Sequence, residues 1–521
     1  MKGKFYESEY EKALIDLLQA EGWQYTNGGN IHRQLREPLL IEDPKVNDLR
    51  VYLQNQYPDL ADSDVTEVIN YLRHVPGQSH FERLRNTFQL VRDGYRYTRH
   101  GDGVNFDIRF IDFDNTDCNI FRAVNQFEVA YGMKNDVRIP DVLLFVNGIP
   151  LCIFELKNPT KLDADIAQAY EQIHTRYMRD IPHLLRYCPL SCISDATDNN
   201  TRLGTTYTPY EHYYAWKKVN NEDPSAQKGI DQVRTIVKGV HEPSRFLEIL
   251  RDYVYFPDEK SGREEEIVCR YPQFFATRMM SDSIRRAFKE QTSKGGTYFG
   301  ATGCGKTYTM MFIARQLALR CKELGSPTVI MIVDRDDLQT QAGKLFLRSQ
   351  DFLQLGTVKV ISDREELKTE LSLRDSGGFF ICTIQKFCES IGELNTRRNI
   401  ICFSDEAHRT QIRLSSKIKV VEHKDIEAKV EQTSAGAVAV RIIDESKIGA
   451  FVTKPYAEQL RTAFPNATFV GFTGTPIAET IQVFGEIVDR YTMQQAVDDE
   501  ITKDIKYIPR IAQVTLDSEK V

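Results

Sequence analysis

Apolar residues recur along this chain with two different periods, and the change between them predicts how the chain is organised. Residues 5–21 carry an apolar stripe at helical spacing, whereas several later segments are short apolar runs of strand length. The polar, turn-rich stretch 217–229 is the best candidate for a domain boundary. Before it, the pattern predicts helices at 64–75 and about 163–180 and strands at 105–113, 120–130, 141–146 and 151–156.

After a predicted helix near 243–254 and a charged loop at 258–266, apolar strands alternate with helices. This alternation is typical of a parallel sheet that helices cover on both faces. The stretch 412–460 predicts an insertion with short strands of its own. We therefore expect an α/β protein with a first domain at 1–225, a helical connector at 226–265, a second domain at 266–495 and the start of a further connection at 496–521.

The composition is that of an ordinary multidomain protein. The 521 residues are 41% hydrophobic, which suffices for several cores. The net charge of −7 argues against a generally basic, nucleic-acid-coated surface, although a local basic channel can lie within an acidic total. The ten cysteines form no Cys-x-x-Cys pair, so we expect reduced thiols in a cytoplasm. Since no apolar run approaches the ~18 residues of a spanning helix, we expect no membrane segment.

A glycine-rich string predicts a nucleotide site. Gly-Ala-Thr-Gly-Cys-Gly-Lys-Thr at residues 300–307 follows an apolar strand signal and opens a helix. Its glycines let the backbone curl so that N–H groups point at phosphates, while the lysine reaches the β and γ oxygens and the last threonine is a ligand for Mg²⁺. The predicted nucleotide-binding residues are Gly300, Thr302, Gly303, Gly305, Lys306 and Thr307.

A second motif further along the chain completes this predicted site. The apolar run 400–403 delivers Asp405 and Glu406 to a strand end. Asp405 can hold Mg²⁺ and Glu406 can polarise the attacking water, so we assign them as metal ligand and catalytic residue. We expect His408 to couple the nucleotide site by a hydrogen bond to the Gly-Phe-Thr-Gly-Thr-Pro string at 471–476, rather than to bind metal.

The N-terminal half carries another chemical signal. Asp141 begins one predicted strand, and the next strand ends in Glu155 and Lys157, which share a face because side chains alternate along a strand. Asp141 and Glu155 are candidate ligands of a Mg²⁺ ion that lowers the pKa of a bound water. Lys157 would orient the nucleophile or steady the scissile phosphate. These three residues are the candidate catalytic residues of a nuclease.

Strand register decides whether Asp141 and Glu155 face the same side. A two-residue turn at 147–148 would set Asp141 opposite Phe154 and on the wrong face. A three-residue loop with its glycine as a left-handed bulge sets Asp141 opposite Ile153 and diagonal to Glu155. That diagonal spans ~7–8 Å between backbones, which lets two carboxylates share one cation. We therefore predict the bulged loop.

The motifs and their order resemble one family. A Pro-Asp…Glu-x-Lys nuclease site at 140–157 followed by a superfamily 2 motor is similar to the restriction subunit of type I restriction-modification enzymes. The resemblance covers most of the chain. Further matching strings are Asn-Gln-Phe-Glu-Val at 125–129, Tyr-Pro-Gln at 271–273, Val-Asp-Arg-Asp-Asp-Leu at 333–338, Thr-Ile-Gln-Lys-Phe at 383–387 and Asp-Glu-Ala-His-Arg-Thr-Gln at 405–411.

By this resemblance the fold is a restriction-endonuclease-like α/β nuclease domain followed by the first RecA-like, parallel-sheet lobe of a DNA translocase. The resemblance implies ATP and Mg²⁺ as cofactors, with Gln273 reading adenine. It also implies double-stranded DNA as substrate and methyltransferase and specificity subunits as partners. The implied function is ATP-dependent translocation followed by non-specific cutting of duplex DNA.

Two features depart from the family pattern. The family's helix after the lysine carries Gln-x-x-x-Tyr, whereas Gln172 and Tyr177 are one residue further apart here. The sequence after Pro476 is too short for the second RecA-like lobe, which supplies an arginine to the ATP site. We therefore expect the chain to be the N-terminal half of a longer protein, with ATP turnover near background when this half is isolated.

Two other functions fit the same motifs. One is a helicase or remodeller whose N-terminal domain binds DNA without cutting it, and the other is a nucleotide-binding scaffold without turnover. Mg²⁺-dependent nicking that is lost in Glu155→Ala separates a nuclease from both. An Asp…Glu-x-Lys pattern by itself also occurs by chance, as a solvated strand end. Glu11, on the first predicted helix, is a candidate further acid at the metal, but a solvated helix face is the favoured interpretation.

Overall fold

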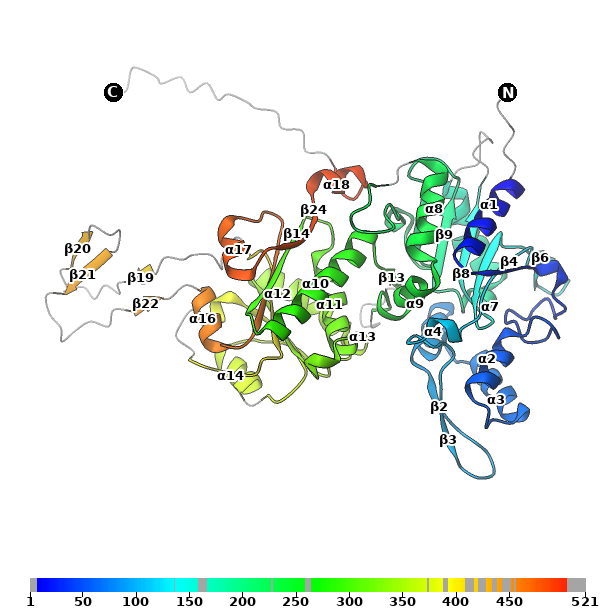
Figure 1. The fold of residues 1–521 in the computed structure, drawn as a ribbon, viewed down its shortest axis with the longest axis horizontal. Coiled ribbons are helices and arrows are strands. Elements are labelled where there is room, and N and C mark those ends of the chain that lie inside the picture. The colour runs from blue at the N-terminus through cyan, green and yellow to red at the C-terminus, as the bar shows by residue number, and fades with distance from the viewer. Residues whose placement is uncertain are drawn as a thin grey trace, which may run out of the picture.

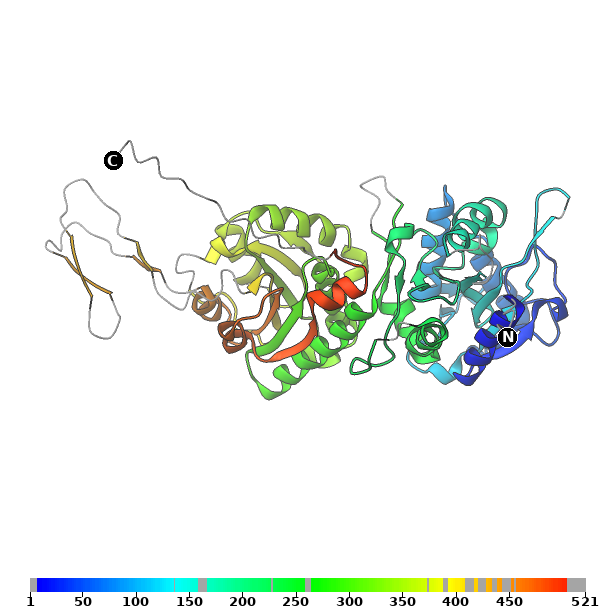
Figure 2. The ribbon, with the colours of Figure 1, turned by 90° about the horizontal axis from the view of Figure 1, so that it is seen from above.

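The computed structural model of the chain forms two α/β bodies that lie along its longest axis (Figures 1 and 2). The N-terminal body is drawn in blue to cyan and the C-terminal body in green to red, with α8 (Gly229–Val240) and α9 (Pro243–Asp252) at their junction (Figure 1). His408 lies outside the described residues. Those residues are 7–134, 136–157, 166–225, 228–257, 264–372, 374–387, 392–407, 417–419, 428–432, 438–442, 451–453 and 456–503.

A seven-stranded mixed sheet is the centre of the N-terminal body. Its order is β1-β4-β7-β8-β9-β10-β11, in which β1 pairs with β4 and β8 with β9 in parallel and the other neighbours are antiparallel. Every residue of β7 and β8 is buried, which is why both read as continuous apolar runs. The strands are β1 (Gln24–Asn27), β4 (Phe121–Asn125), β7 (Val142–Val146), β8 (Ile149–Leu156), β9 (Leu190–Ser194), β10 (Thr201–Gly204) and β11 (Tyr214–Ala215).

Apolar cores cover both faces of this sheet. Cys152 faces a core that includes Leu14 of α1 (Glu7–Ala20), and the next residue, Ile153, faces a core that includes Ile173. The helices predicted at 5–21 and 64–75 are confirmed, whereas α2 and α4 were not predicted. The remaining helices of this body before the junction are α2 (Asp48–Gln56), α3 (Asp62–Arg73), α4 (His80–Asp93), α5 (Ile166–Glu171), α6 (Met178–Asp180) and α7 (Pro182–Leu185).

The strand predicted at 120–130 is interrupted. Gln126 has a φ of 51°, so the chain turns after β4, and β5 (Val129–Tyr131) pairs with β6 (Asp136–Arg138) outside the main sheet. A non-glycine residue in this left-handed region does not continue a strand. The strand predicted at 105–113 is also shorter, as β3 (Asn105–Ile108) in a hairpin with β2 (Tyr95–Thr98).

A second seven-stranded sheet, parallel throughout, forms the C-terminal body in the order β16-β17-β15-β18-β23-β14-β24. This confirms the predicted parallel α/β architecture. The strands are β14 (Lys294–Gly300), β15 (Thr328–Val333), β16 (Val358–Val360), β17 (Phe379–Thr383), β18 (Ile400–Ser404), β23 (Thr468–Thr473) and β24 (Ile487–Tyr491). The helices are α10 (Tyr271–Glu290), α11 (Lys306–Leu319), α12 (Asp336–Leu347), α13 (Gln350–Leu353), α14 (Arg364–Ser372), α16 (Tyr456–Ala463), α17 (Ala478–Phe484) and α18 (Met493–Asp498).

The insertion predicted at 412–460 does contain short strands. In its described residues, β19 (Lys417–Lys419) pairs antiparallel with β22 (Phe451–Thr453), and β20 (Ala428–Gln432) pairs antiparallel with β21 (Val438–Ile442). Across the described part of the chain, no helix combines the length and the apolar character that a membrane span requires.

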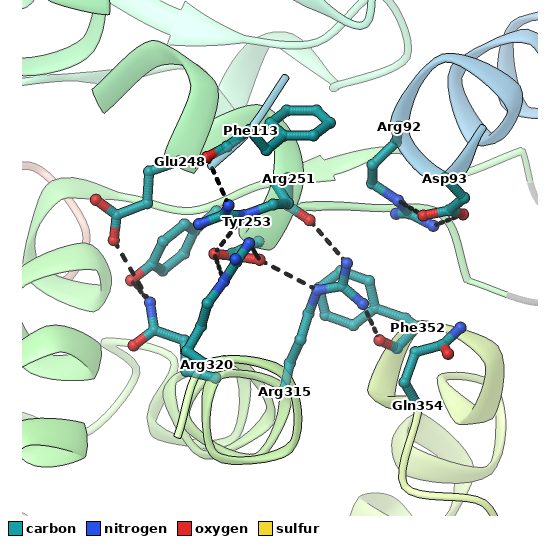
Figure 3. A network of polar contacts seen from close by, with 12 residues as sticks. Arg92, Asp93, Phe113, Glu248, Arg251, Tyr253, Arg315, Arg320, Phe352 and Gln354 are labelled. Carbon is teal, nitrogen blue, oxygen red and sulfur yellow. Dashed lines mark hydrogen bonds and ion pairs between the residues drawn. The ribbon is translucent and has the colours of Figure 1, made fainter. Parts of the chain in front are cut away.

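A buried polar network joins the two bodies (Figure 3). Asp252, the last residue of α9, lies 3.1 Å from Arg320 Nε and 3.9 Å from Arg315 Nε. Arg315, on α11, also donates to the Arg251 carbonyl at 2.8 Å, and Arg251 donates to the Phe113 carbonyl of the N-terminal body at 2.9 Å. Burial lowers the pKa of Arg315 to about 9 and raises the pKa of Asp252. The buried charges of Asp252 and Arg315 are therefore stable only because they lie beside each other.

The polar stretch predicted as a boundary is a second contact between the bodies. Lys217 Nζ lies 2.9 Å from Asp499 Oδ1, and both side chains are buried. Asn221 Nδ2 donates to Asp489 Oδ1 at 3.0 Å. A buried ion pair holds its two segments in one geometry because neither charge is stable there alone. This stretch therefore attaches the N-terminal body to the C-terminal body.

Replacing Asp252 by asparagine removes the negative charge from the network and leaves Arg315 buried without its counter-charge. We expect the free energy of unfolding to fall by about 3–5 kcal/mol, as for other buried ion pairs that lose one partner. The matched control, Asp114→Asn, removes an exposed carboxylate near Arg251 and Arg320 and should cost at most about 1 kcal/mol. Chemical denaturation measures both, and equal losses would contradict a structural role for the buried carboxylate.

Two candidate active sites

The turn between β7 and β8 differs from the predicted one. Val146 pairs with Ile149, so the turn has two residues, Asn147 (φ 49°) and Gly148 (φ 75°). Positive φ at both central residues is the geometry of the common tight hairpin turn, which favours Asn-Gly. The predicted positive φ of Gly148 is confirmed, but the predicted three-residue loop is wrong.

A β-bulge inside the hairpin supplies the missing register shift. Phe145 pairs with Pro150, whereas Leu144 pairs with Cys152, so Leu151 is an extra residue in β8. Proline cannot donate a ladder hydrogen bond, and prolines within sheets therefore sit at edges and bulges. The register shift that we predicted in the turn therefore occurs within β8, beside Pro150.

The bulge brings Asp141 and Glu155 to one face. Val142 pairs with Phe154, so continuing the register by one residue sets Asp141 directly opposite Glu155 rather than diagonal to it. Asp141 Oδ2 accepts a hydrogen bond from Leu156 N at 2.6 Å, which fixes the carboxylate beside β8. Directly opposed residues in an antiparallel pair are separated by about 4.5–5.5 Å between Cβ atoms, close enough for a shared cation. The predicted convergence of these two carboxylates is therefore present.

The Glu155 carboxyl is fully buried and held at both oxygens. Lys157 Nζ lies 2.7 Å from Oε1, and Tyr177 Oη donates to Oε2 at 3.1 Å. Burial, followed by the negative charge of Asp141, raises the pKa of Glu155 to about 8, and Lys157 and Tyr177 act in the opposite direction. Two carboxylates that disfavour each other's charge are a fitting donor set for a divalent cation, which would relieve that repulsion.

A π-helical turn absorbs the one-residue excess between Gln172 and Tyr177. Residues Gln172–Tyr177 form this turn between α5 and α6. A π turn has i→i+5 hydrogen bonds, so residues five apart come together on one face. Gln172 Nε2 donates to Tyr177 Oη at 2.7 Å, and Tyr177 donates to Glu155. Both residues therefore reach the site despite the altered spacing.

Glu11 is buried, so the favoured expectation of a solvated helix face is wrong. The residue is 9% exposed, and Asn125 Nδ2 donates to its Oε1. Asn125 ends β4 and pairs with Val142, which places this contact at the sheet end that carries Asp141. The sequence did hold a signal, because Glu11 precedes Leu14 by three residues and shares the buried stripe of α1.

A third group of potential ligands lies on the other face of the sheet. Cys152, Cys192 and His241 are fully buried, and the two Sγ atoms lie 3.8 and 3.7 Å from His241 Nε2. His241 Nδ1 lies 3.1 Å from the Ile236 carbonyl, which leaves Nε2 to face the thiols. Their ligand atoms lie within 4.8 Å of one another. Sequence reasoning missed this group because its members come from two strands and a helix end.

The predicted phosphate loop joins β14 to α11 and has the expected backbone. Gly303 and Gly305 have φ of 84° and 87°, and Gly305 caps α11. Lys306 and Thr307 follow in the first turn, at a helix N-terminus that favours anions. Lys306 Nζ lies 3.2 Å from the Gly300 carbonyl, so its ammonium group faces back over the loop.

The second nucleotide motif lies beside this loop. Asp405 and Glu406 follow β18, and Glu406 Oε1 lies 3.6 Å from Lys306 Nζ. Burial raises the pKa of Asp405 to about 6, although the charge of Lys306 opposes that shift. Between β18 and β14 lies β23, and a Cβ atom on the following Gly474 would be 3.4 Å from Thr302 Oγ1. The structure therefore brings all three predicted motor motifs together.

Gln273 contacts the phosphate loop from α10. Its Nε2 donates to the Gly305 carbonyl at 3.4 Å, and its Oε1 accepts from Arg270 N at 2.9 Å. These bonds fix the amide beside the loop, and its role in reading adenine stays a prediction. The role of His408 also stays a prediction, because the residue is not among those described.

A family model of known proteins matches each of the two bodies. The family model "Type I restriction enzyme R protein N terminus" matches residues 4–212, and the model "SWI2/SNF2 ATPase" matches residues 272–521. The chain is similar to type I restriction enzyme endonuclease subunits along nearly its whole length. This confirms the family and the fold class that the motifs predicted. The catalytic and ligand roles of individual residues in this chain stay predictions.

Two curated relatives are named type I restriction enzyme endonuclease subunits. The HindI subunit of Haemophilus influenzae is 33% identical over 96% of this chain and 46% of that protein. The SsaAORF53P subunit of Staphylococcus saprophyticus is 22% identical over 99% of this chain and 49% of that protein. The chain thus spans about half the length of these relatives.

Glu155→Gln should change how stability depends on pH. Because the pKa of Glu155 is raised from its ordinary value of 4.5 to about 8, the folded chain binds more protons than the unfolded chain between these values. Glu155 therefore lowers stability progressively as the pH rises through that window. In chelator-containing buffer, we expect Glu155→Gln to match the wild type near pH 4.5 and to resist denaturant better above pH 8. The exposed Glu128→Gln is the control, and a difference that does not widen with pH would contradict the buried titration.

Proposed function

We propose that this chain is the nuclease and ATPase portion of an enzyme that translocates along double-stranded DNA and cuts it. One observation carries the proposal. A buried carboxyl, Glu155, held by Lys157 and opposed by Asp141, occurs in the same chain as a phosphate loop whose Lys306 faces Glu406 at 3.6 Å. The names of the relatives, which are endonuclease subunits, support it.

In the proposed nuclease reaction, Asp141 and Glu155 would hold Mg²⁺. A divalent cation there would lower the pKa of a water molecule and share the charge of the scissile phosphate. Lys157 lies 2.7 Å from Glu155 and can donate to the nucleophile or to a phosphate oxygen as charge develops. Tyr177 fixes the second oxygen of Glu155 at 3.1 Å, so the carboxylate presents one orientation to its ligand.

In the proposed ATPase reaction, the backbone of residues 300–305 and Lys306 bind the phosphates. Thr307 and Asp405 would hold Mg²⁺, which neutralises charge on the phosphates, and Glu406 would polarise the attacking water. Lys306 Nζ now donates to the Gly300 carbonyl at 3.2 Å, and a phosphate oxygen would become its stronger, charged partner.

The proposed partners are a methyltransferase subunit and a specificity subunit that reads the DNA sequence. The names of the relatives, which describe each of them as a subunit, support an assembly of this kind. The alternative is a remodeller that binds DNA without cutting. It gives no reason for a fully buried carboxyl opposed by a second one, an arrangement that costs stability unless it serves chemistry.

Alanine replacement of Asp141, Glu155 or Lys157 should abolish Mg²⁺-dependent nicking of plasmid DNA. Loss of charge stabilisation at the phosphoryl centre should lower the rate by at least about 100- to 1000-fold. ATP affinity should not change, because the nucleotide loop belongs to the other body. Wild-type nicking by Glu155→Ala protein would refute the nuclease assignment.

Lys306→Ala is the complementary variant. It should lose ATP binding, measured by calorimetry, and keep whatever nicking occurs without nucleotide. Retained ATP affinity in this variant would refute the assignment of the phosphate loop.

Tyr177→Phe removes only the hydroxyl that orients Glu155. We expect nicking or Mg²⁺ affinity to fall about 10- to 100-fold, the range for groups that orient metal ligands. Tyr170→Phe, in the adjoining helix α5, is the matched control and should leave both unchanged. An equal effect of the two substitutions would indicate a general disturbance of the helix rather than loss of the bond to Glu155.

A further inference from the structure

Two cysteines and a histidine meet in the core of the N-terminal body, on the face of the sheet opposite to Glu155. Cys152 and Cys192 come from the neighbouring parallel strands β8 and β9, and His241 is the C-cap of α8. All three side chains are fully buried, and their ligand atoms lie within 4.8 Å of one another. Three side chains of the types that bind zinc therefore converge from two strands and a helix end.

The distances between these atoms match those between two ligands of one zinc ion. Cys152 Sγ lies 3.8 Å from His241 Nε2, and Cys192 Sγ lies 3.7 Å from the same nitrogen. Zinc binds sulfur at about 2.3 Å and imidazole nitrogen at about 2.0–2.1 Å. Bond angles of about 109–120° at the ion then place sulfur and nitrogen about 3.5–3.8 Å apart. The three side chains thus need little movement to hold a cation between them.

The imidazole of His241 is already oriented for coordination. Its Nδ1 lies 3.1 Å from the Ile236 carbonyl oxygen and donates to it, because a carbonyl can only accept. Nε2 of the neutral ring then presents its lone pair to both sulfurs. Metal-binding histidines in proteins commonly donate from the other ring nitrogen to a carbonyl or a carboxylate in this way. The ring also packs against Phe154 and Phe246, with centroids 4.8 and 5.7 Å away.

Hydrogen bonds within this group are weak. A thiol is a poor donor and a poor acceptor, and the single lone pair of Nε2 faces two of them. The two thiols also interact with each other, and Cys152 Sγ lies 4.0 Å from the Ile153 carbonyl oxygen, a long contact even for sulfur. A cation that replaces both thiol hydrogens would give the two sulfurs and the ring nitrogen one strong common partner.

Charge decides which cation fits. Thiolates select soft or borderline ions such as Zn²⁺ and Cu⁺ rather than Mg²⁺. Each cysteine releases its thiol proton to solvent when it binds a metal, so Zn²⁺ with two thiolates and a neutral imidazole has no net charge. Cu⁺ in the same place would leave one uncompensated negative charge in an apolar core, which is costly. The fully buried position therefore favours Zn²⁺.

We propose that Cys152, Cys192 and His241 form a Zn²⁺ site that ties the α8–α9 connector to the central sheet of the N-terminal body. Among the described residues, no fourth Cys, His, Asp or Glu belongs to the group, so the ion would have three protein ligands and a small fourth ligand such as water. The ion would fix β8 from the face opposite to Glu155. This site is independent of the proposed nuclease and ATPase reactions.

Metal content and Co²⁺ spectroscopy test the ligands. The purified chain should contain about one Zn²⁺ by elemental analysis, as expected for a single site. Co²⁺ bound in place of Zn²⁺ should give the ultraviolet charge-transfer absorption that requires thiolate ligands and that a carboxylate site does not produce. Cys152→Ala and Cys192→Ala should each lose the zinc and the absorption. Far-ultraviolet circular dichroism verifies that each variant is folded.

Two control variants separate this site from its surroundings. Cys188→Ala removes another fully buried cysteine, which belongs to the core on the opposite face of the sheet, and should keep both the zinc and the absorption. Glu155→Gln alters the proposed nuclease site and should keep both as well. A wild-type chain without zinc and without the Co²⁺ absorption would overturn the proposal, as would equal losses in Cys188→Ala and Cys192→Ala.

Thermal melting tests whether the ion stabilises the fold. Wild-type chain refolded from denaturant with a zinc-selective chelator and excess Mg²⁺ should melt about 5 °C or more below chain refolded with Zn²⁺, because an ion that binds only the folded state stabilises it. Cys192→Ala should melt at the same temperature under both conditions. A shift of equal size in the two proteins, or none in the wild type, would refute a zinc site at these residues and leave the proposed nuclease and ATPase sites unaffected.

Discussion

Burial of the Glu155 carboxyl at the end of β8 is the constraint on which the geometry of the N-terminal body depends. An isolated carboxylate in an interior costs several kcal/mol, so it persists only where partners are supplied. Lys157 directly follows the same strand, and Tyr177 is brought in by a π turn. Asp141 is brought opposite by the bulge at Leu151. The irregular features of the backbone are therefore what assembles the site, and the regular strands between them supply its rigid frame.

The parts of the structure that could be predicted are those in which one local pattern has one physical outcome. Buried parallel strands read as apolar runs, so the motor sheet was predictable, and glycines between a strand and a helix predicted the loop at 300–307. The face shared by Glu155 and Lys157 was predictable from side-chain alternation alone. In each case the local structure depends only on residues within a short stretch of the chain.

The parts that could not be predicted depend on partners distant in the sequence. A one-residue shift between β7 and β8 can be made in the turn or in the strand, and counting residues does not distinguish these possibilities. The stretch 217–229 reads as a linker because its residues are polar, but Lys217 finds a buried counter-charge at Asp499 in the motor. Glu11 reads as solvated until Asn125 is placed beside it. Whether a polar residue is buried and paired therefore depends on which distant segment of the chain packs against it.

Helix α11 connects the phosphate loop at one end with the buried polar network between the two bodies at the other. It starts at Lys306 in the phosphate loop and carries Arg315 near its other end, while Arg320 follows just beyond it. Its 14 residues make a rod about 21 Å long. Asp252 clamps the far end to the connector, so this end cannot shift without moving α9. A shift of α11 at its phosphate-loop end would therefore be transmitted through Asp252 to α9 and, through the hydrogen bond from Arg251 to Phe113, to the N-terminal body.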